Sequence, residues 1–184
     1  MSGRKAAMIL LGGVLSVLAG SLLAQPDFGF MPDGGRQTLL RLARSSAIDL
    51  EEIARGIGTE EEWKAIVAAA DPDLSSDAVE TLASYLAVNM PAQIDTPAAA
   101  GIEELAAALP LDGKELAIEN CQFCHSFFTG YLAHDRDTEG WRSVFKAPFH
   151  KELPMTEKER ETFARYSAIN MPIPYEKVPE DLRF

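Results

Sequence analysis

Apolar residues recur every three or four positions along much of the chain, which is the spacing of one face of an α-helix. The pattern is clearest from Thr38 to Ala43, from Trp63 to Ala69 and from Ala78 to Val88. The β-branched residues Val, Ile and Thr are scattered and do not form the alternating runs that favour strands. The sequence therefore predicts an all-α protein.

The first residues differ from the rest because they form an almost uninterrupted apolar run. Arg4 and Lys5 precede this run, which extends from Ala6 to Ala24 without a charged side chain. A basic start followed by an apolar run is typical of an export signal. A helix of this length would also span roughly 28 Å, nearly the thickness of a bilayer core. We expect residues 1–24 to be a cleaved signal peptide or a retained membrane anchor, and the rest of the chain to be periplasmic.

Two stretches have the composition of linkers. Residues 25–36 are rich in Gly, Pro and Asp, and residues 92–101 contain Pro97. After Asn170, the chain carries three further prolines, which favour an extended tail over the surface: Pro172, Pro174 and Pro179.

Two copies of one helical unit are present in the sequence. Segment 80–91 returns 81 positions later as segment 161–172, with the shared pattern Glu-Thr-x-Ala-x-Tyr-x-Ala-x-Asn-Met-Pro. Upstream, Trp63 matches Trp141 at an offset of 78 positions. Internal repetition of this kind indicates tandem structural units.

We expect the first unit over residues 37–91 and the second over residues 102–184. In each unit a Ser or Thr is expected to cap the final helix, Ser75 in the first and Thr156 in the second.

The second copy contains Cys121-Gln-Phe-Cys124-His125, which is the attachment pattern for haem c. Two thiols at this spacing can bind the two vinyl groups of one haem, and the adjacent histidine then lies beneath the iron as its proximal ligand. A thioredoxin-like pair would need a βαβ context, and a zinc site would need two more ligands at finger-like spacing. We therefore expect one covalent haem c, held by Cys121, Cys124 and His125.

The sequence resembles the c-type cytochrome superfamily through this motif, a Gly-Trp helix start and a final helix led by Thr-x-x-Glu and ending in Tyr-x-x-x-Asn. The resemblance covers residues 115–172 and, as a degenerate copy, residues 48–91. Segment 42–49 of that copy has neither Cys nor His, so only the second unit is expected to carry haem. The resemblance implies two small units with a class I-like cytochrome c fold. It also implies a role like that of cytochrome subunits serving exported molybdenum or quinoprotein dehydrogenases.

The sequence differs from that family at the second axial ligand of the iron. The position where the family usually has a methionine ligand is Pro148 in this chain. Met171 has a counterpart in Met90 of the haem-less copy, so packing explains its presence. Met155 lies where the first copy has a leucine, as an apolar contact before the final helix. His150 has no counterpart, and we expect it to be the distal ligand, with Met155 as the alternative. Histidine would lower the reduction potential, and methionine would raise it.

Aromatic side chains gather around the attachment motif. We expect them to wall the haem and exclude water, with plain core packing as the alternative: Phe123, Phe127, Phe128 and Tyr131. His134 lies in a polar run and is expected at the surface.

Composition and charge limit the possible partners. With 28 acidic and 17 basic side chains, the formal net charge is −11. This charge repels phosphate backbones and anionic membrane surfaces. We expect no nucleic-acid partner, membrane contact only through residues 1–24, and a preference for a basic redox partner.

These observations predict an exported c-type cytochrome that transfers single electrons through one haem and has no catalytic activity of its own. Its partner is expected to be a dehydrogenase subunit or a respiratory or photosynthetic electron carrier. The haem-less copy would be a scaffold or docking domain. The alternatives are a haem-based gas or redox sensor and a small haem enzyme, both of which need an open sixth position on the iron.

Overall fold

The structure is a computed structural model that describes residues 28–94 and 101–183, and all regular elements within these ranges are helical. This confirms the prediction of an all-α protein. The α-helices are α1 (Gly35–Arg44), α2 (Leu50–Arg55), α3 (Glu60–Ala70), α4 (Ser76–Asn89), α5 (Ile102–Ala108), α6 (Gly113–Cys121), α7 (Thr138–Val144) and α8 (Glu157–Asn170). Shorter segments are the π-helix η1 (Phe128–Leu132) and the 3₁₀ turns η2 (His150–Glu152), η3 (Tyr175–Lys177) and η4 (Glu180–Leu182).

Polar side chains fix the starts of the two longest helices. Ser75 accepts a hydrogen bond from the N–H of Ala78 at the start of α4. Thr156 accepts one from the N–H of Glu159 at the start of α8. Such caps satisfy N–H groups that have no partner within the helix. The prediction that Ser75 and Thr156 cap these helices is confirmed.

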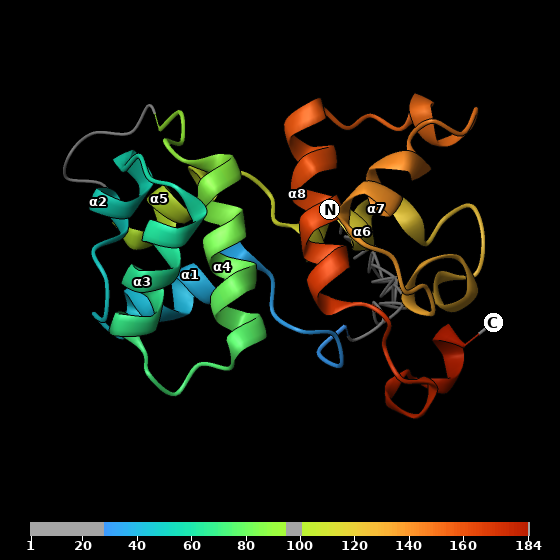
Figure 1. Cartoon of the computed structure of the whole chain (residues 1–184), viewed down its shortest axis with the longest axis horizontal. Helices are drawn as coiled ribbons and strands as arrows, with labels where there is room; N and C mark the ends of the chain where they lie inside the picture. Colours follow the sequence, from blue (N-terminus) through green and yellow to red (C-terminus); the bar gives the residue numbers. More distant parts are fainter. Residues whose placement is uncertain (1–27, 95–100, 184) are drawn as a thin grey trace, which may run out of the picture.

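The helices form two lobes in Figure 1, and each lobe contains one cluster of buried hydrophobic side chains. The first cluster lies among α1 to α5 and includes Trp63 and Leu82. The second cluster lies among α6, η1, α7 and α8 and includes Trp141 and Phe163. Helices α4 and α8 pack against each other between the lobes.

Reciprocal hydrogen bonds join α4 and α8. The amide of Asn89 donates to the hydroxyl of Thr162 at 3.0 Å, and the amide of Asn170 donates to the hydroxyl of Thr81 at 2.9 Å. Each residue of one pair lies 81 positions from its counterpart in the other pair. Because buried polar groups need partners, these bonds specify the register in which the two helices pack.

The segment before α1 packs on the second lobe, and the segment before α6 packs on the first lobe. Met31, which is 2% exposed, belongs to the second cluster, whereas Leu105 and Leu109 belong to the first. Two tyrosine hydroxyls fix these segments by donating to main-chain carbonyls, Tyr166 to Pro32 at 2.8 Å and Tyr85 to Pro110 at 2.7 Å.

The structure therefore differs from the expected linker over residues 25–36. In its described part, residues 28–34 are packed, and α1 already begins at Gly35. The physical reason is that apolar side chains interrupt the Gly and Pro composition and are buried or half-buried: Phe28, Phe30 and Met31. Helix α5, which we assigned to the second unit, packs on the first cluster because Leu105 and Leu109 find their apolar contacts there. Residues 25–27 and 95–100 lie outside the described residues.

The chain after α8 packs on the second cluster. Ile173 and Val178 are buried, and the N–H of Ile173 donates to the carbonyl of Leu132 at 2.8 Å. The expected tail thus runs over the surface of this lobe, but it includes η3 and η4 in addition to extended backbone.

None of the helices in the two described ranges has the length and apolar character needed to cross a membrane. The expected export segment, residues 1–24, lies outside the described residues.

Replacing Gly113 by alanine is expected to destabilise the fold. Gly113 lets α6 cross α8 closely, because a Cβ there would overlap with the side chain of Tyr166. Overpacking of this kind costs about 1–3 kcal/mol of unfolding free energy, which urea titration of Gly113→Ala measures. The control is Gly101→Ala, where the added Cβ meets no atom within 4 Å. An equal loss in both variants would contradict this account of the crossing.

Candidate functional site

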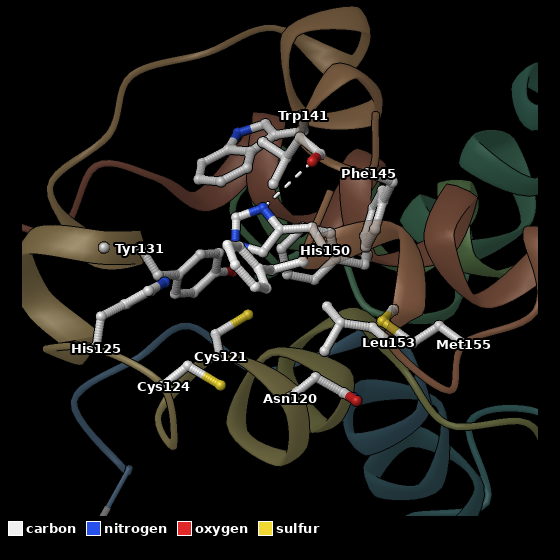
Figure 2. A pocket seen from close by; sticks show the side chains of 14 residues that line it. Asn120, Cys121, Cys124, His125, Tyr131, Trp141, Phe145, His150, Leu153 and Met155 are labelled. Atoms are coloured by element: carbon white, nitrogen blue, oxygen red, sulfur yellow. Dashed lines mark hydrogen bonds between the residues drawn. The ribbon is translucent and has the colours of Figure 1, made fainter. Parts of the chain in front are cut away.

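The second lobe contains a cavity of about 340 Å³ whose walls are mostly apolar. It lies between the end of α6, the helices η1, α7 and α8, and the loop that joins α7 to α8 (Figure 2). Its lining residues are Asn120, Cys121, Cys124, His125, Gly130, Tyr131, Trp141, Val144, Phe145, Phe149, His150, Leu153, Met155 and Phe163. The cavity has the size and character of a site for a small molecule or cofactor. It brings together the motif residues Cys121, Cys124 and His125 with both expected candidates for the distal ligand.

His125 is seated against the backbone of η1. A Cβ at Gly130 would overlap with the imidazole ring of His125, so only glycine allows the ring to lie this close. The Nδ1 atom of His125 is 3.2 Å from the carbonyl oxygen of its neighbour Ser126. A carbonyl can only accept, so Nδ1 is the donor and Nε2 is free to bind a metal.

His150 faces His125 across the cavity. The two imidazole centroids are 6.3 Å apart, and the ring planes are inclined by 71°. The Nδ1 atom of His150 lies 3.2 Å from the carbonyl oxygen of Val144, to which it donates (Figure 2). This contact leaves Nε2 of His150 without its proton. It is the arrangement typical of a histidine that binds a metal through Nε2.

The two methionine alternatives occupy different places. Met155 is 8% exposed and lines the cavity beside Leu153, so it is also within the site. Met171 is buried in the second cluster and does not line the cavity. Its counterpart Met90 belongs to the first cluster in the same way, which agrees with a packing role for both.

The thiols of Cys121 and Cys124 line the cavity near the end of α6 (Figure 2). Cys121 is the last residue of α6 and is half-buried, whereas Cys124 is exposed. Burial raises the pKa of the Cys121 thiol to about 12. Because the thiolate is the nucleophilic form of cysteine, this raised pKa lowers the reactivity of Cys121 at neutral pH.

The described residues contain no group of three or more His, Cys, Asp or Glu side chains placed to hold a metal ion. The cavity thus offers two facing imidazoles, and it lacks the ligand set of a structural zinc site within the described part of the chain.

The aromatic walls differ from those expected. Tyr131 lines the cavity, but Phe123 is 77% exposed and Phe127 is buried against Phe28, so neither lines it. The reason is that Phe123 sits in the turn between the cysteines, while Phe127 points into the second cluster. Phe128 stacks edge-on against Tyr175 of the tail.

Other walls come from residues that sequence reasoning missed. Phe145 and Phe163 pack edge-to-face in the cavity wall, and Leu153 joins them. A usable signal for Phe145 was its position four residues after Trp141, which places both on one face of a helix. His134, expected at the surface, is half-buried with its ring centroid 6.3 Å from that of Trp141.

The two lobes differ most in the loop before the final helix. In the first lobe, residues 71–75 join α3 to α4, whereas residues 145–156 join α7 to α8 in the second. The longer loop carries both candidates for the distal ligand, His150 and Met155. At an offset of 78 positions, the counterparts of Cys121 and His125 are Ala43 and Ala47, which offer no ligand.

Comparisons with known proteins found no matching family model, no matching curated protein and no matching solved structure.

The two thiols are expected to react at different rates in protein prepared without haem. Cys124 is exposed, whereas Cys121 is half-buried and protonated, so iodoacetamide should modify Cys124 at least about tenfold faster at pH 8. The rate of modification at Cys121 should still rise between pH 8 and pH 10. Its raised pKa lies above this range, so each increase in pH raises the small fraction of reactive thiolate. Mass spectrometry of Cys121→Ser and Cys124→Ser measures each thiol alone. Equal rates in the two variants would contradict the described burial.

Proposed function

We propose that this protein transfers single electrons through one haem c covalently bound to Cys121 and Cys124, with His125 and His150 as the two iron ligands. One observation carries the proposal: two imidazoles face each other across an apolar cavity that both thiols of the attachment motif also line. A bound haem iron would accept and return one electron by changing between its ferric and ferrous states.

The separation of the two histidines fits ligation of one metal ion from opposite sides. When two imidazoles bind one metal ion from opposite sides, their centroids are separated by two metal–nitrogen bonds of about 2 Å and by the distance from centroid to nitrogen in each ring. These lengths add up to about 6 Å. The observed distance is 6.3 Å. The contact of His150 Nδ1 with the carbonyl of Val144 also directs its Nε2 to the metal. These contacts support His150 over Met155 as the distal ligand.

The mostly apolar walls of the cavity support a mostly apolar bound group. Tyr131, Phe145 and Phe163 exclude water, and a dry environment disfavours additional charge on the iron. The Nε1–H of Trp141 is buried and lacks a partner among the described residues. Because a buried donor without a partner is costly, it is available to a carboxylate of the bound group.

Reciprocal contacts support an origin of the two lobes as tandem cytochrome c-like units, of which only the second kept its haem. Asn89 and Asn170 make equivalent bonds across the interface, as reported above. After each final helix, the main chain also returns to an equivalent carbonyl, through Ala92 to Ala54 and through Ile173 to Leu132. The Nε1–H of Trp63, like that of Trp141, is buried and has no partner among residues 28–94 and 101–183, which suits a unit that has lost the group it once bound.

On this proposal the protein is an exported electron carrier or the cytochrome subunit of a larger redox complex, and it catalyses no reaction itself. Its own residues hold the imidazoles in place and keep water from the site. The first unit serves as a scaffold or docking domain for the partner. The export signal in residues 1–24 and the net charge of −11 support an exported protein with a basic redox partner.

Replacing His150 should change the spin state of the ferric haem protein. Two histidine ligands give a low-spin ferric iron, and His150→Ala should convert nearly all of it to a high-spin form. Met155→Ala should leave the low-spin signal unchanged, because its sulfur is not a ligand in this account. Low-temperature EPR together with the near-infrared spectrum measures both variants.

Two results would contradict the ligand assignment. A methionine-to-iron charge-transfer band that is lost only in Met155→Ala would assign Met155 as the distal ligand. A high-spin wild-type protein would favour the sensor or enzyme alternatives, which need an open sixth position.

A further inference from the structure

Arg160 of α8 is bonded to the loop that carries His150. Its Nη2 donates to the carbonyl of Lys151 at 2.8 Å and to the carbonyl of Leu153 at 3.2 Å. Its guanidinium also lies over the ring of Phe145, with 5.0 Å between Cζ and the ring centroid. Hydrogen bonds from a charged donor are stronger than those between neutral groups. Arg160 thus ties the loop to both the last long helix and the cavity wall.

The loop around His150 has few other attachments. Phe149 is 89% exposed, and Lys151 and Glu152 are exposed as well. Within the loop, the N–H of Lys151 donates to the carbonyl of Ala147, and the N–H of Leu153 donates to the carbonyl of His150. These two bonds are local, so they do not fix the loop relative to the rest of the lobe. Among the described residues, residues 149–153 are attached to the rest of the lobe by the packing of Leu153 on the second cluster, by the hydrogen bond of His150 to Val144 and by the two hydrogen bonds of Arg160.

The surroundings of Arg160 differ from those of the other arginines on α7 and α8. Arg142 and Arg165 both form ion pairs with Glu161, whereas Arg160 takes part in no ion pair within the described residues. Its counterpart in the first lobe, 81 positions earlier, is Val79. An arginine therefore occurs at this position only in the lobe that has the long loop.

We propose that Arg160 is a positioning residue for the distal iron ligand: by binding the carbonyls of Lys151 and Leu153, it holds His150 opposite His125. This inference rests on the proposed function, since it assigns Arg160 a role in keeping His150 on the iron. Without these bonds the loop opens locally, and His150 leaves the ligand position for part of the time.

The test compares Arg160→Gln with Arg165→Gln, a matched control on the same helix whose ion pairs within the described residues go to Glu161 and Glu60 and not to the loop. In haem-loaded protein, Arg160→Gln should bind carbon monoxide at least about tenfold faster in the ferrous state and show a high-spin ferric fraction in EPR. In haem-free protein, its amides of Leu153 and Met155 should exchange hydrogen at least about tenfold faster. Arg165→Gln should match the wild type in all three measurements. Arg160→Lys should give intermediate values, because an ammonium keeps a charged donor near the carbonyls.

The outcomes separate this inference from the proposed function. If Arg160→Gln behaves like Arg165→Gln, Arg160 does not position the loop. If amide exchange rises while carbon monoxide binding and spin state stay unchanged, Arg160 anchors the loop but does not control His150, and the inference is wrong. If the wild-type protein attaches no haem, the proposed function is wrong. The hydrogen-exchange rates of the haem-free variants then test only whether Arg160 holds the loop.

Discussion

Helix α8 packs against α4, α6 and α7, and the parts of the cavity depend on this packing. On one side, Thr162 accepts the hydrogen bond of Asn89 from the first lobe. On another side of α8, the close approach of Tyr166 to Gly113 sets the position of α6, which ends at the first cysteine of the motif. The same helix also contributes Phe163 to the cavity wall and Arg160 to the distal loop. A single rigid helix therefore relates the thiols, the cavity wall and the loop to one another.

The sequence was enough to predict the helical class and the capping residues, because each of these depends on residues that are close together in the chain. It did not identify the cavity walls. Phe123 is adjacent to the cysteines in sequence but points to solvent, while Phe163 reaches the cavity from a helix far along the chain. The packing of Met31 on the opposite lobe was also not predictable, since periodicity identifies an apolar face without identifying what covers it.

The distal ligand illustrates the same limit. Sequence comparison of the two copies selected His150 because it has no counterpart in the first copy and kept Met155 as the alternative, but it could not orient the loop that carries them. In the structure, the rings of His150 and His125 lie 6.3 Å apart and His150 is bonded to Val144, while Met155 lines the same cavity. The orientation depends on contacts from α7 and α8, which join residues distant in sequence. A pair of histidines on a bound haem would give it a lower reduction potential than a histidine and a methionine would.

The central claim is that the chain carries one covalent haem, in its second lobe only. Intact-mass and peptide mass spectrometry of protein expressed with a haem-attachment system measures this most directly, with an alkaline pyridine spectrum to identify the bond type. The account predicts one haem per chain, joined by two thioethers through Cys121 and Cys124. A chain of unmodified mass with both thiols free, produced under conditions in which a known c-type cytochrome is fully loaded, would contradict it.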